Sequence, residues 1–335
     1  MMPFPRRFFL STVLALYTSA RQTTAFQPLS RRKYYNCLFL RLAAINGEAV
    51  ATKETVNGQD QKPPLTIGDT FTSNPMTVFI EDTDTYGVVY NGNYLRFYDR
   101  ALSSLSCYCT DRHVMTAVGN QKFRSSPALG DEYLIEGTLQ DVSDHRAVWD
   151  LVMKSVDGTI MYHSADGVVV TPTDHPEWLD VVNPFDAASH LPGATDSFVA
   201  YRDEFDPSMR SHLPLTSVLN HMERPRTNVF GGPKELRRLQ EQDGIVVVVT
   251  GIRDLCLLPH ATESLIGDVV TVETVYDMRK GGMRWDLFQT MYTSSGERLA
   301  QGIVTLYSLN KETFRPTSKL PQRLLDRLQG GQQGD

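Results

Sequence analysis

Cysteine is scarce in this sequence of 335 residues, which contains four, at positions 37, 107, 109 and 256. No two of them form the Cys-x-x-Cys pair that is typical of zinc sites and dithiol redox centres. They also offer no even disulfide framework, because Cys37 lies in an N-terminal segment that we expect to be removed. We interpret the remaining thiols as buried or free in a reducing compartment.

Several catalytic motifs are missing as well. The sequence has no Gly-x-Ser-x-Gly, no Gly-x-Gly-x-x-Gly, no Walker loop and no His-Glu-x-x-His. A serine hydrolase, a dinucleotide enzyme, a nucleotide hydrolase or a zinc protease each depends on one of these motifs to hold its nucleophile, cofactor or metal. We therefore expect this protein to bind neither a cofactor nor a metal.

Acidic residues are absent from one part of the chain and abundant in the rest. Residues 1–47 contain seven Lys or Arg and no Asp or Glu, which leaves 26 basic against 39 acidic residues and a formal net charge of −13 on the remainder. A body with this charge repels nucleic acid and anionic membranes. The charge distribution therefore predicts no nucleic-acid partner.

The first 47 residues are typical of a targeting segment. Arg6 and Arg7 precede an apolar stretch, residues 8–17, that fits the core of a signal peptide but is shorter than the roughly 20 residues that span a bilayer. The following basic, acid-free sequence is typical of a transit peptide. Its Ala-Phe-Gln-Pro junction, residues 25–28, resembles the cleavage site of the bipartite presequences of secondary-plastid algae, diatoms in particular. The resemblance implies a stromal plastid protein without a stable membrane anchor; a secreted protein with a basic propeptide is the alternative.

Two segments of the remaining chain match each other. Gly-Asp begins one strand pattern at Gly130 and another at Gly267, and Trp-Asp-Leu recurs at Trp149 and Trp285, so the offsets are 137 and 136 residues. This register indicates an internal duplication. The predicted organisation is a flexible lead-in (48–70), a first domain (71–172), a linker (173–198), a second domain (199–312) and a polar C-terminal tail (313–335).

Each copy is expected to hold one long helix before its strands. Apolar residues recur at three- and four-residue spacing over 93–105, and again from Leu215 to Met222, where Pro225 is expected to end the helix. Residues 161–172 and 297–309 alternate between apolar and polar, which is typical of a half-buried antiparallel sheet. The order is strand, helix and about four antiparallel strands, twice, with no further helix. This is an α+β arrangement.

The stretch from Asp82 to Ala101, DTDTYGVVYNGNYLRFYDRA, resembles the active-site motif of hot-dog-fold thioesterases of the 4-hydroxybenzoyl-CoA thioesterase type. The resemblance covers about residues 75–172 and, more weakly, 199–310. It implies two tandem hot-dog domains, each an antiparallel sheet wrapped around a long helix. It also implies that the two domains pair edge to edge into one continuous sheet, as an internal pseudo-dimer. Further self-association stays open.

The resemblance also implies a site and a reaction. Asp84 corresponds to the catalytic carboxylate, which attacks an acyl-CoA or acyl-carrier-protein thioester or activates water. The start of the helix, with the backbone of Asn91, would form the oxyanion site. Residues expected to contact the substrate are Gly87, Val88, Val89, Tyr90, Asn93, Tyr94 and Phe97. The simpler interpretation of Asp84 is a turn or N-cap residue, and Asp82, which points the other way along an extended strand, is assigned a structural role.

The second copy departs from this motif. Asp206 falls about where Asp84 would fall and His212 follows it, but Met209-Arg210-Ser211 replaces the glycine-bearing turn. We interpret Asp206 as a remnant or structural residue rather than a second base. Alternatives to an acyl thioesterase are an aryl-CoA thioesterase with a substrate like dihydroxynaphthoyl-CoA, a hot-dog hydratase or dehydratase, and a non-catalytic acyl-thioester-binding protein.

Overall fold

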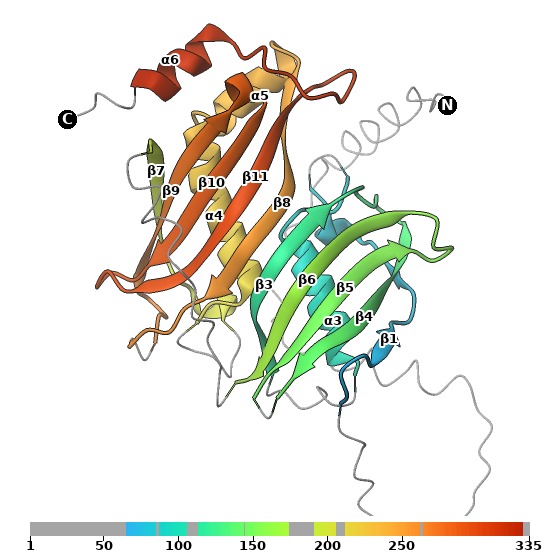
Figure 1. Ribbon diagram of the computed structural model, residues 1–335. Coiled ribbons are helices and arrows are strands. Elements are labelled where there is room, and N and C mark those ends of the chain that lie inside the picture. Colours follow the sequence, from blue (N-terminus) through green and yellow to red (C-terminus); the bar gives the residue numbers. More distant parts are fainter. Residues whose placement is uncertain are drawn as a thin grey trace, which may run out of the picture. The chain divides into compact units, whose positions relative to one another are not determined.

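The structure is a computed structural model that describes residues 65–84, 87–105, 113–143, 145–173, 191–205, 212–261 and 264–330 (Figure 1). Some of the sequence-based expectations concern residues outside these ranges. They are the targeting segment 1–47, most of the lead-in, the thiols of Cys37, Cys107 and Cys109, and Asp206 of the second candidate site.

In the first half of the described chain, one long helix precedes four long strands. The elements are β1 (Thr70–Thr72), β2 (Met76–Thr77), the 3-10 helix η2 (Ile80–Asp82), α3 (Asn93–Ser103), β3 (His113–Phe123), β4 (Glu132–Val142), β5 (Ala147–Ser155) and β6 (Met161–Pro172). The helix α3 lies where the apolar spacing of residues 93–105 predicts it.

The second half has a similar order with additional helices. The elements are β7 (Gly193–Val199), η3 (Arg202–Glu204), α4 (Leu215–Val229), α5 (Pro233–Glu241), β8 (Ile245–Leu257), β9 (Val269–Arg279), η4 (Lys280–Gly282), β10 (Arg284–Tyr292), β11 (Arg298–Asn310) and α6 (Gln322–Gly330). None of the helices in the described ranges is both long and apolar enough to cross a lipid bilayer.

The strands form one large antiparallel sheet. Its eleven strands follow the order β1-β4-β5-β6-β3-β8-β11-β10-β9-β7, with β2 paired to β4, within the described part of the chain. The two halves meet where β3 pairs with β8, in a register that runs from Ala117 opposite Cys256 to Lys122 opposite Gly251. Strand pairing therefore continues across the middle of the sheet without an open edge.

The helix α3 packs against the strands of its own half (Figure 1). Tyr94, Phe97 and Tyr98 are fully buried on one face of the helix, as their three- and four-residue spacing requires. Phe97 contacts the ring of Tyr133 on β4 with 4.9 Å between centroids, and the Tyr98 hydroxyl lies 2.7 Å from Nδ1 of His163 on β6. These contacts fix α3 to the sheet.

The helix α4 packs in the same way in the second half. Val218, Leu219 and Met222 are buried, and the side-chain amide of Gln289 on β10 donates to the Met222 carbonyl (2.7 Å) and to the Thr274 hydroxyl (2.8 Å). Both halves therefore place a long helix on their strands.

The prediction that Pro225 ends the second helix is wrong. The helix α4 continues through Pro225 to Val229, with Val229 and Phe230 buried. A proline inside a helix costs about 3 kcal/mol, but burying each of two large apolar side chains gains about 1.5–3 kcal/mol. The expectation of no further helix is also wrong, since α5 follows, with Leu239 buried on the core side.

Two predicted irregular segments also contain regular structure. The linker 173–198 includes most of β7, whose seven residues pair with β9 from Gly193 opposite Val275 onward. The tail 313–335 includes α6, whose Leu324 and Leu328 are buried. The polar composition of both segments predicted irregular structure. The first segment nevertheless forms a strand because it pairs with β9, and the second forms a helix because Leu324 and Leu328 are buried on one face.

Candidate active site

Asp84 lies at the start of a tight turn that leads the chain back toward α3. The Asp84 amide donates to the Val88 carbonyl (2.9 Å), and the Gly87 amide donates to the Asp84 carbonyl (3.0 Å). Gly87 has φ +73°, in the left-handed region that favours glycine. The Asp84 side chain is half-buried, and the Val88 amide lies 3.5 Å from its Oδ1. The turn therefore fixes the backbone on both sides of this carboxylate.

A neighbouring loop holds the far side of the turn. The Val89 amide donates to the Pro127 carbonyl (3.0 Å), and the Leu129 amide donates to the Gly87 carbonyl (3.1 Å). Val88 and Ala128 also pair as an isolated antiparallel bridge. Three of the residues predicted to contact substrate are thus part of one pinned segment.

Asp82 anchors this segment to the helix. Its carbonyl accepts from the Tyr90 amide (3.1 Å) and from the side-chain amide of Asn93 (2.9 Å). Its fully buried carboxylate accepts from the Phe79 amide (3.0 Å) and lies 3.6 Å from the Arg100 guanidinium. Asp82 stands in a 3-10 turn, not on the extended strand that the sequence suggested, because its side chain caps that turn. It does have the predicted structural role.

The start of α3 offers two backbone donors. Gly92 is the N-cap of the helix, and the Asn93 amide donates back to the Tyr90 carbonyl (2.9 Å). Within the described part of the chain, the amides of Asn91 and Gly92 donate to no other group. Unpaired amides and the positive end of the helix dipole make such a terminus suited to a negatively charged oxygen.

Helix α4 of the second half comes close to this helix start. A Cβ on Gly92 would lie 2.4 Å from Oδ1 of Asn220 and 3.0 Å from the ring of Tyr90. Glycine is therefore required here by close approach, not by its φ angle. Asn220 is itself exposed, whereas Gly92 is buried beside its side chain.

Tyr90 connects the turn to the buried side of α4. Burial raises the pKa of Tyr90, while the charge of Arg226 and a hydrogen bond with it lower that pKa, and the carboxylates of Glu223 and Asp84 raise it. Arg226 is only 6% exposed. The candidate site therefore includes charged groups from both halves.

Tyr94 and Phe97 extend from the site into the core. Both are fully buried, and their rings meet edge to face with 6.3 Å between centroids. Burial raises the pKa of Tyr94, and the nearby Asp84 charge raises it further. Tyr94 is thus close enough to Asp84 to sense its charge, whereas Phe97 packs on Tyr133 deeper in the core.

Sequence reasoning missed His163 on β6. Its ring lies 4.5 Å from that of Tyr94 and 4.6 Å from that of Phe123, and complete burial lowers the pKa of His163 to about 3. A single histidine in an alternating strand carries no signal of its own. Only the pairing of β6 with β3, which sets His163 opposite Phe123, shows that it lies beneath the helix.

His212, the second histidine considered, lies in a different environment. It is buried, its Nε2 lies 3.1 Å from the Leu258 carbonyl, and its ring is 4.2 Å from that of His260. Burial first, and the charge of His260 second, lower the pKa of His212 to about 4. The proposed partner Asp206 lies outside the described residues, so no second site is assembled from the side chains that the structure places.

The second half repeats the anchoring carboxylate of the first. Glu204 accepts from the Tyr201 amide (2.9 Å) and lies 2.6 Å from Nε2 of His221 on α4, which stacks on Phe198 with 3.4 Å between centroids. Asp82 does the same with the Phe79 amide and Arg100 on α3. The two halves therefore share a device that holds a short 3-10 turn to a long helix.

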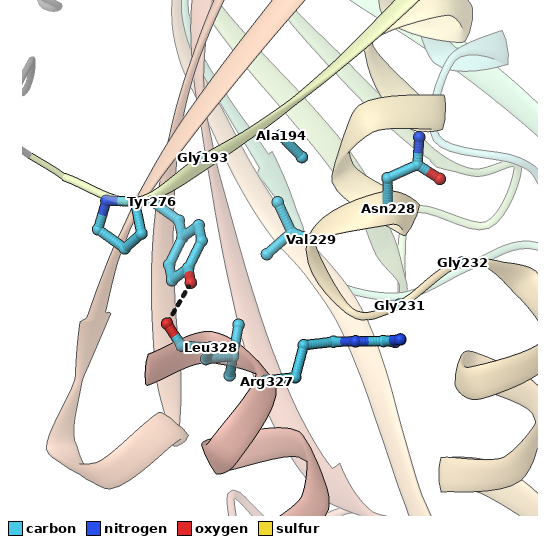
Figure 2. A pocket seen from close by; sticks show the side chains of 10 residues that line it. Gly193, Ala194, Asn228, Val229, Gly231, Gly232, Tyr276, Arg327 and Leu328 are labelled. Atoms are coloured by element: carbon cyan, nitrogen blue, oxygen red, sulfur yellow. Dashed lines mark hydrogen bonds between the residues drawn. The ribbon is translucent and has the colours of Figure 1, made fainter. Parts of the chain in front are cut away.

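A cavity of about 410 Å³ lies elsewhere, between α6 and the end of α4 (Figure 2). Tyr276 and Arg327 project into its margin, and the Tyr276 hydroxyl donates to the Leu328 carbonyl (3.2 Å). None of the predicted site residues lines this cavity. Among the described residues, no three His, Cys, Asp or Glu side chains gather as a metal site would require.

Part of the candidate site lies in a segment whose sequence matches a known protein family. Residues 86–162 match the thioesterase superfamily. This thioesterase-superfamily match begins two residues after Asp84 and takes in the glycine turn, α3 and strands β3 to β5. A search of curated protein sequences gives no match.

Solved structures extend the similarity in fold beyond that segment. A Lactobacillus plantarum protein assigned as an oleoyl thioesterase is similar with a TM-score of 0.53 and 10% identity, over 72% of this chain and 97% of that chain. The 12:0-ACP thioesterase of Umbellularia californica is similar with a TM-score of 0.50 and 8% identity, over 71% of this chain and 94% of that chain. At these identities the similarity establishes a hot-dog fold and not a reaction.

Proposed function

We propose that this protein hydrolyses acyl thioesters of CoA or of acyl carrier protein to the free acid and thiol. The observation that carries the proposal is the position of Asp84, two residues before the thioesterase-superfamily match, in a turn that leads to the unpaired amides of Asn91 and Gly92. A carboxylate and a helix N-terminus are the two groups that this reaction requires.

In this proposal the thioester oxygen lies against the amides at the start of α3. Each such donor is worth about 2.7–4 kcal/mol of transition-state stabilisation in other enzymes. Asp84 then attacks the thioester carbon, which expels the thiolate and leaves a mixed anhydride for water to hydrolyse, or it takes a proton from a water that attacks in its place. The pinned turn keeps the carboxylate in position for either route.

We also propose that the chain is a duplicated, double hot-dog protein whose halves pair through β3 and β8. The shared anchoring of Asp82 and Glu204 supports this proposal, as do Trp149 and Trp285, both fully buried, on β5 and β10. The acyl-ACP substrate of the Umbellularia californica enzyme supports acyl carriers as the substrate class.

The test is release of free thiol from a panel of acyl-CoA and acyl-carrier-protein thioesters. We expect Asp84→Asn to lower turnover by about 10²–10⁴-fold, the usual contribution of a positioned acid or base. Asp206→Asn is the matched control in the second half and is expected to keep turnover near that of the wild type. Undiminished turnover in Asp84→Asn would refute the assignment, and no thiol release from any thioester would refute hydrolysis.

We further propose that residues 1–47 direct the protein to a plastid. The acid-free, basic sequence and the Ala-Phe-Gln-Pro junction at 25–28 support this destination. A fluorescent protein fused after residue 47 is expected to collect in the plastid of a diatom cell. Secretion of the fusion would favour the alternative of a secreted protein.

A further inference from the structure

Arg226 is a buried cation that this protein does not fully pair. It lies on α4 and is 6% exposed, and within the described part of the chain its Nη1 is buried with no hydrogen-bond partner. Arginine is rarely buried unless paired, because removing its charge from water is costly. A buried donor without a partner in a folded protein calls for a specific explanation.

The carboxylate nearest in sequence does not neutralise this cation directly. Glu223 lies one turn earlier on the same helix. Burial lowers the pKa of Arg226 and the charge of Glu223 raises it, but the Glu223 Oε1 accepts from the Thr227 hydroxyl (2.9 Å). Arg226 also interacts with the hydroxyl of Tyr90. A neutral phenol satisfies one donor of a guanidinium that has five.

The position of Arg226 relates it to the candidate active site. Tyr90 belongs to the segment between Gly87 and α3, and Asn220, six residues before Arg226, meets Gly92 at the helix start. Arg226 interacts with the Tyr90 hydroxyl, and the far edge of the Tyr90 ring lies beside Gly92, where a Cβ would be 3.0 Å from Cε1 of that ring. Arg226 therefore lies near the start of α3.

The burial of Arg226 also indicates which part of a thioester substrate can reach it. Phosphate groups of CoA or of an acyl carrier stay near solvent, whereas Arg226 is buried. An acyl group that enters beneath the helices is the part that reaches such a place. Carboxylate and other oxygen acceptors are the groups that guanidinium binds best.

We infer that Arg226, from the second half, binds an acceptor oxygen on the acyl group of the substrate. This deepens the proposed function and rests on it. The preferred substrates are then thioesters whose acyl group carries a carboxylate or hydroxyl oxygen. Arg226 is a specificity-determining residue, and the second half contributes it to a site whose carboxylate lies in the first.

The test compares matched thioesters that differ only by this oxygen. The pairs are straight-chain acyl-CoAs against their ω-carboxy counterparts over a series of chain lengths, and benzoyl-CoA against 4-hydroxybenzoyl-CoA. The wild type is expected to prefer the oxygen-bearing member of at least one pair. Arg226→Met is expected to reduce that preference, as a ratio of kcat/KM, by at least about tenfold.

Three further variants separate this role from a structural one. Arg226→Lys keeps the charge and is expected to retain part of the preference. Arg224→Met removes an exposed arginine of the same helix and is expected to change nothing. Tyr90→Phe is expected to keep most of the preference. If Tyr90→Phe instead reproduced Arg226→Met, Arg226 would merely position Tyr90 and the inference would be wrong.

Binding of non-hydrolysable CoA thioethers keeps this inference distinct from the proposed function. Calorimetry with the same oxygen-bearing and oxygen-free pairs measures the preference without turnover. A preference that Arg226→Met abolishes, in a protein that releases no thiol, would support the binding site and refute hydrolysis. Equal binding and turnover of both members of every pair in the wild type would overturn the inference.

Discussion

The Tyr98 hydroxyl on α3 lies 2.7 Å from Nδ1 of His163 on β6, and both side chains are fully buried. Because burial lowers the pKa of His163 to about 3, the imidazole is neutral at physiological pH. One hydrogen bond between neutral groups therefore joins the long helix to the middle of the sheet, with the rings of Tyr94 and Phe123 against the imidazole.

Tyr98→Phe is expected to destabilise the protein by about 1–3 kcal/mol, because it leaves a buried imidazole nitrogen without its partner. The double variant Tyr98→Phe with His163→Leu removes both polar groups and is expected to recover part of that loss. Urea denaturation measures the free energy of unfolding of each. A control is Tyr201→Phe, at a side chain that is 67% exposed; equal losses in Tyr98→Phe and this control would contradict the prediction.

Stability is expected to fall as the pH decreases from about 6.5 toward 5. The pKa of His163 is about 3 when folded but about 6.5 when unfolded, so in this range only the unfolded chain takes up the proton. The free energy of unfolding then decreases by at most about 1.4 kcal/mol per pH unit for this group. His212, with a pKa of about 4, adds a second contribution of the same sign.

Urea denaturation at several pH values tests this dependence. The double variant without His163 is expected to have a shallower decrease than the wild type between about pH 6.5 and 5, above the range in which most carboxylates titrate. Parallel curves for the two proteins would show that the histidine is not the cause.

Gly137→Ala is expected to loosen the outer strand β1. Phe71 on β1 lies directly opposite Gly137 on β4, and a Cβ on Gly137 would come within 2.1 Å of the Phe71 ring. Phe71 also packs edge to face on Trp149, with 5.4 Å between centroids. Displacing this ring is expected to cost about 1–3 kcal/mol, the usual cost of overpacking. Thermal unfolding of Gly137→Ala, Phe71→Ala and the double variant gives the coupling, and additive losses would contradict the clash.

Arg323→Gln is expected to release α6 from the second half. The Arg323 guanidinium donates to Glu235 at 2.7 Å and to both carboxylate oxygens of Asp243, one of them at 3.0 Å. These bonds raise the pKa of Arg323 and lower that of Asp243. Limited proteolysis is expected to cut the C-terminal segment sooner in Arg323→Gln than in Arg327→Gln, which removes an exposed arginine of the same helix. The same rate for both variants would contradict the prediction.

The regular parts of the fold were predictable because local spacing determines them. Apolar residues from Tyr94 to Leu102 repeat with the helical period, and α3 lies there. The start of helix α4 was predicted correctly, but its end was not. Pro225 is a local signal for the end of a helix, whereas the burial of Val229 and Phe230 depends on the rest of the fold. The strand β7 and the helix α6 were missed for the same reason.

The candidate site shows the same limit. The glycine turn and the start of α3 follow from a contiguous motif, so their proximity to Asp84 needs only local geometry. Arg226 and His163 lie 142 and 79 residues further along the chain than Asp84, and only the packing of α4 and of β6 brings them near. A lone arginine and a lone histidine do not reveal their burial in sequence.

The pairing of β3 with β8 has a consequence for how the molecule melts. Without the other half, β3 of the first half or β8 of the second would be an edge strand with unpaired backbone groups. Heating is therefore expected to give one calorimetric peak for the whole polypeptide rather than two. The two fragments produced by cleavage between residues 173 and 191 are expected to remain bound to each other.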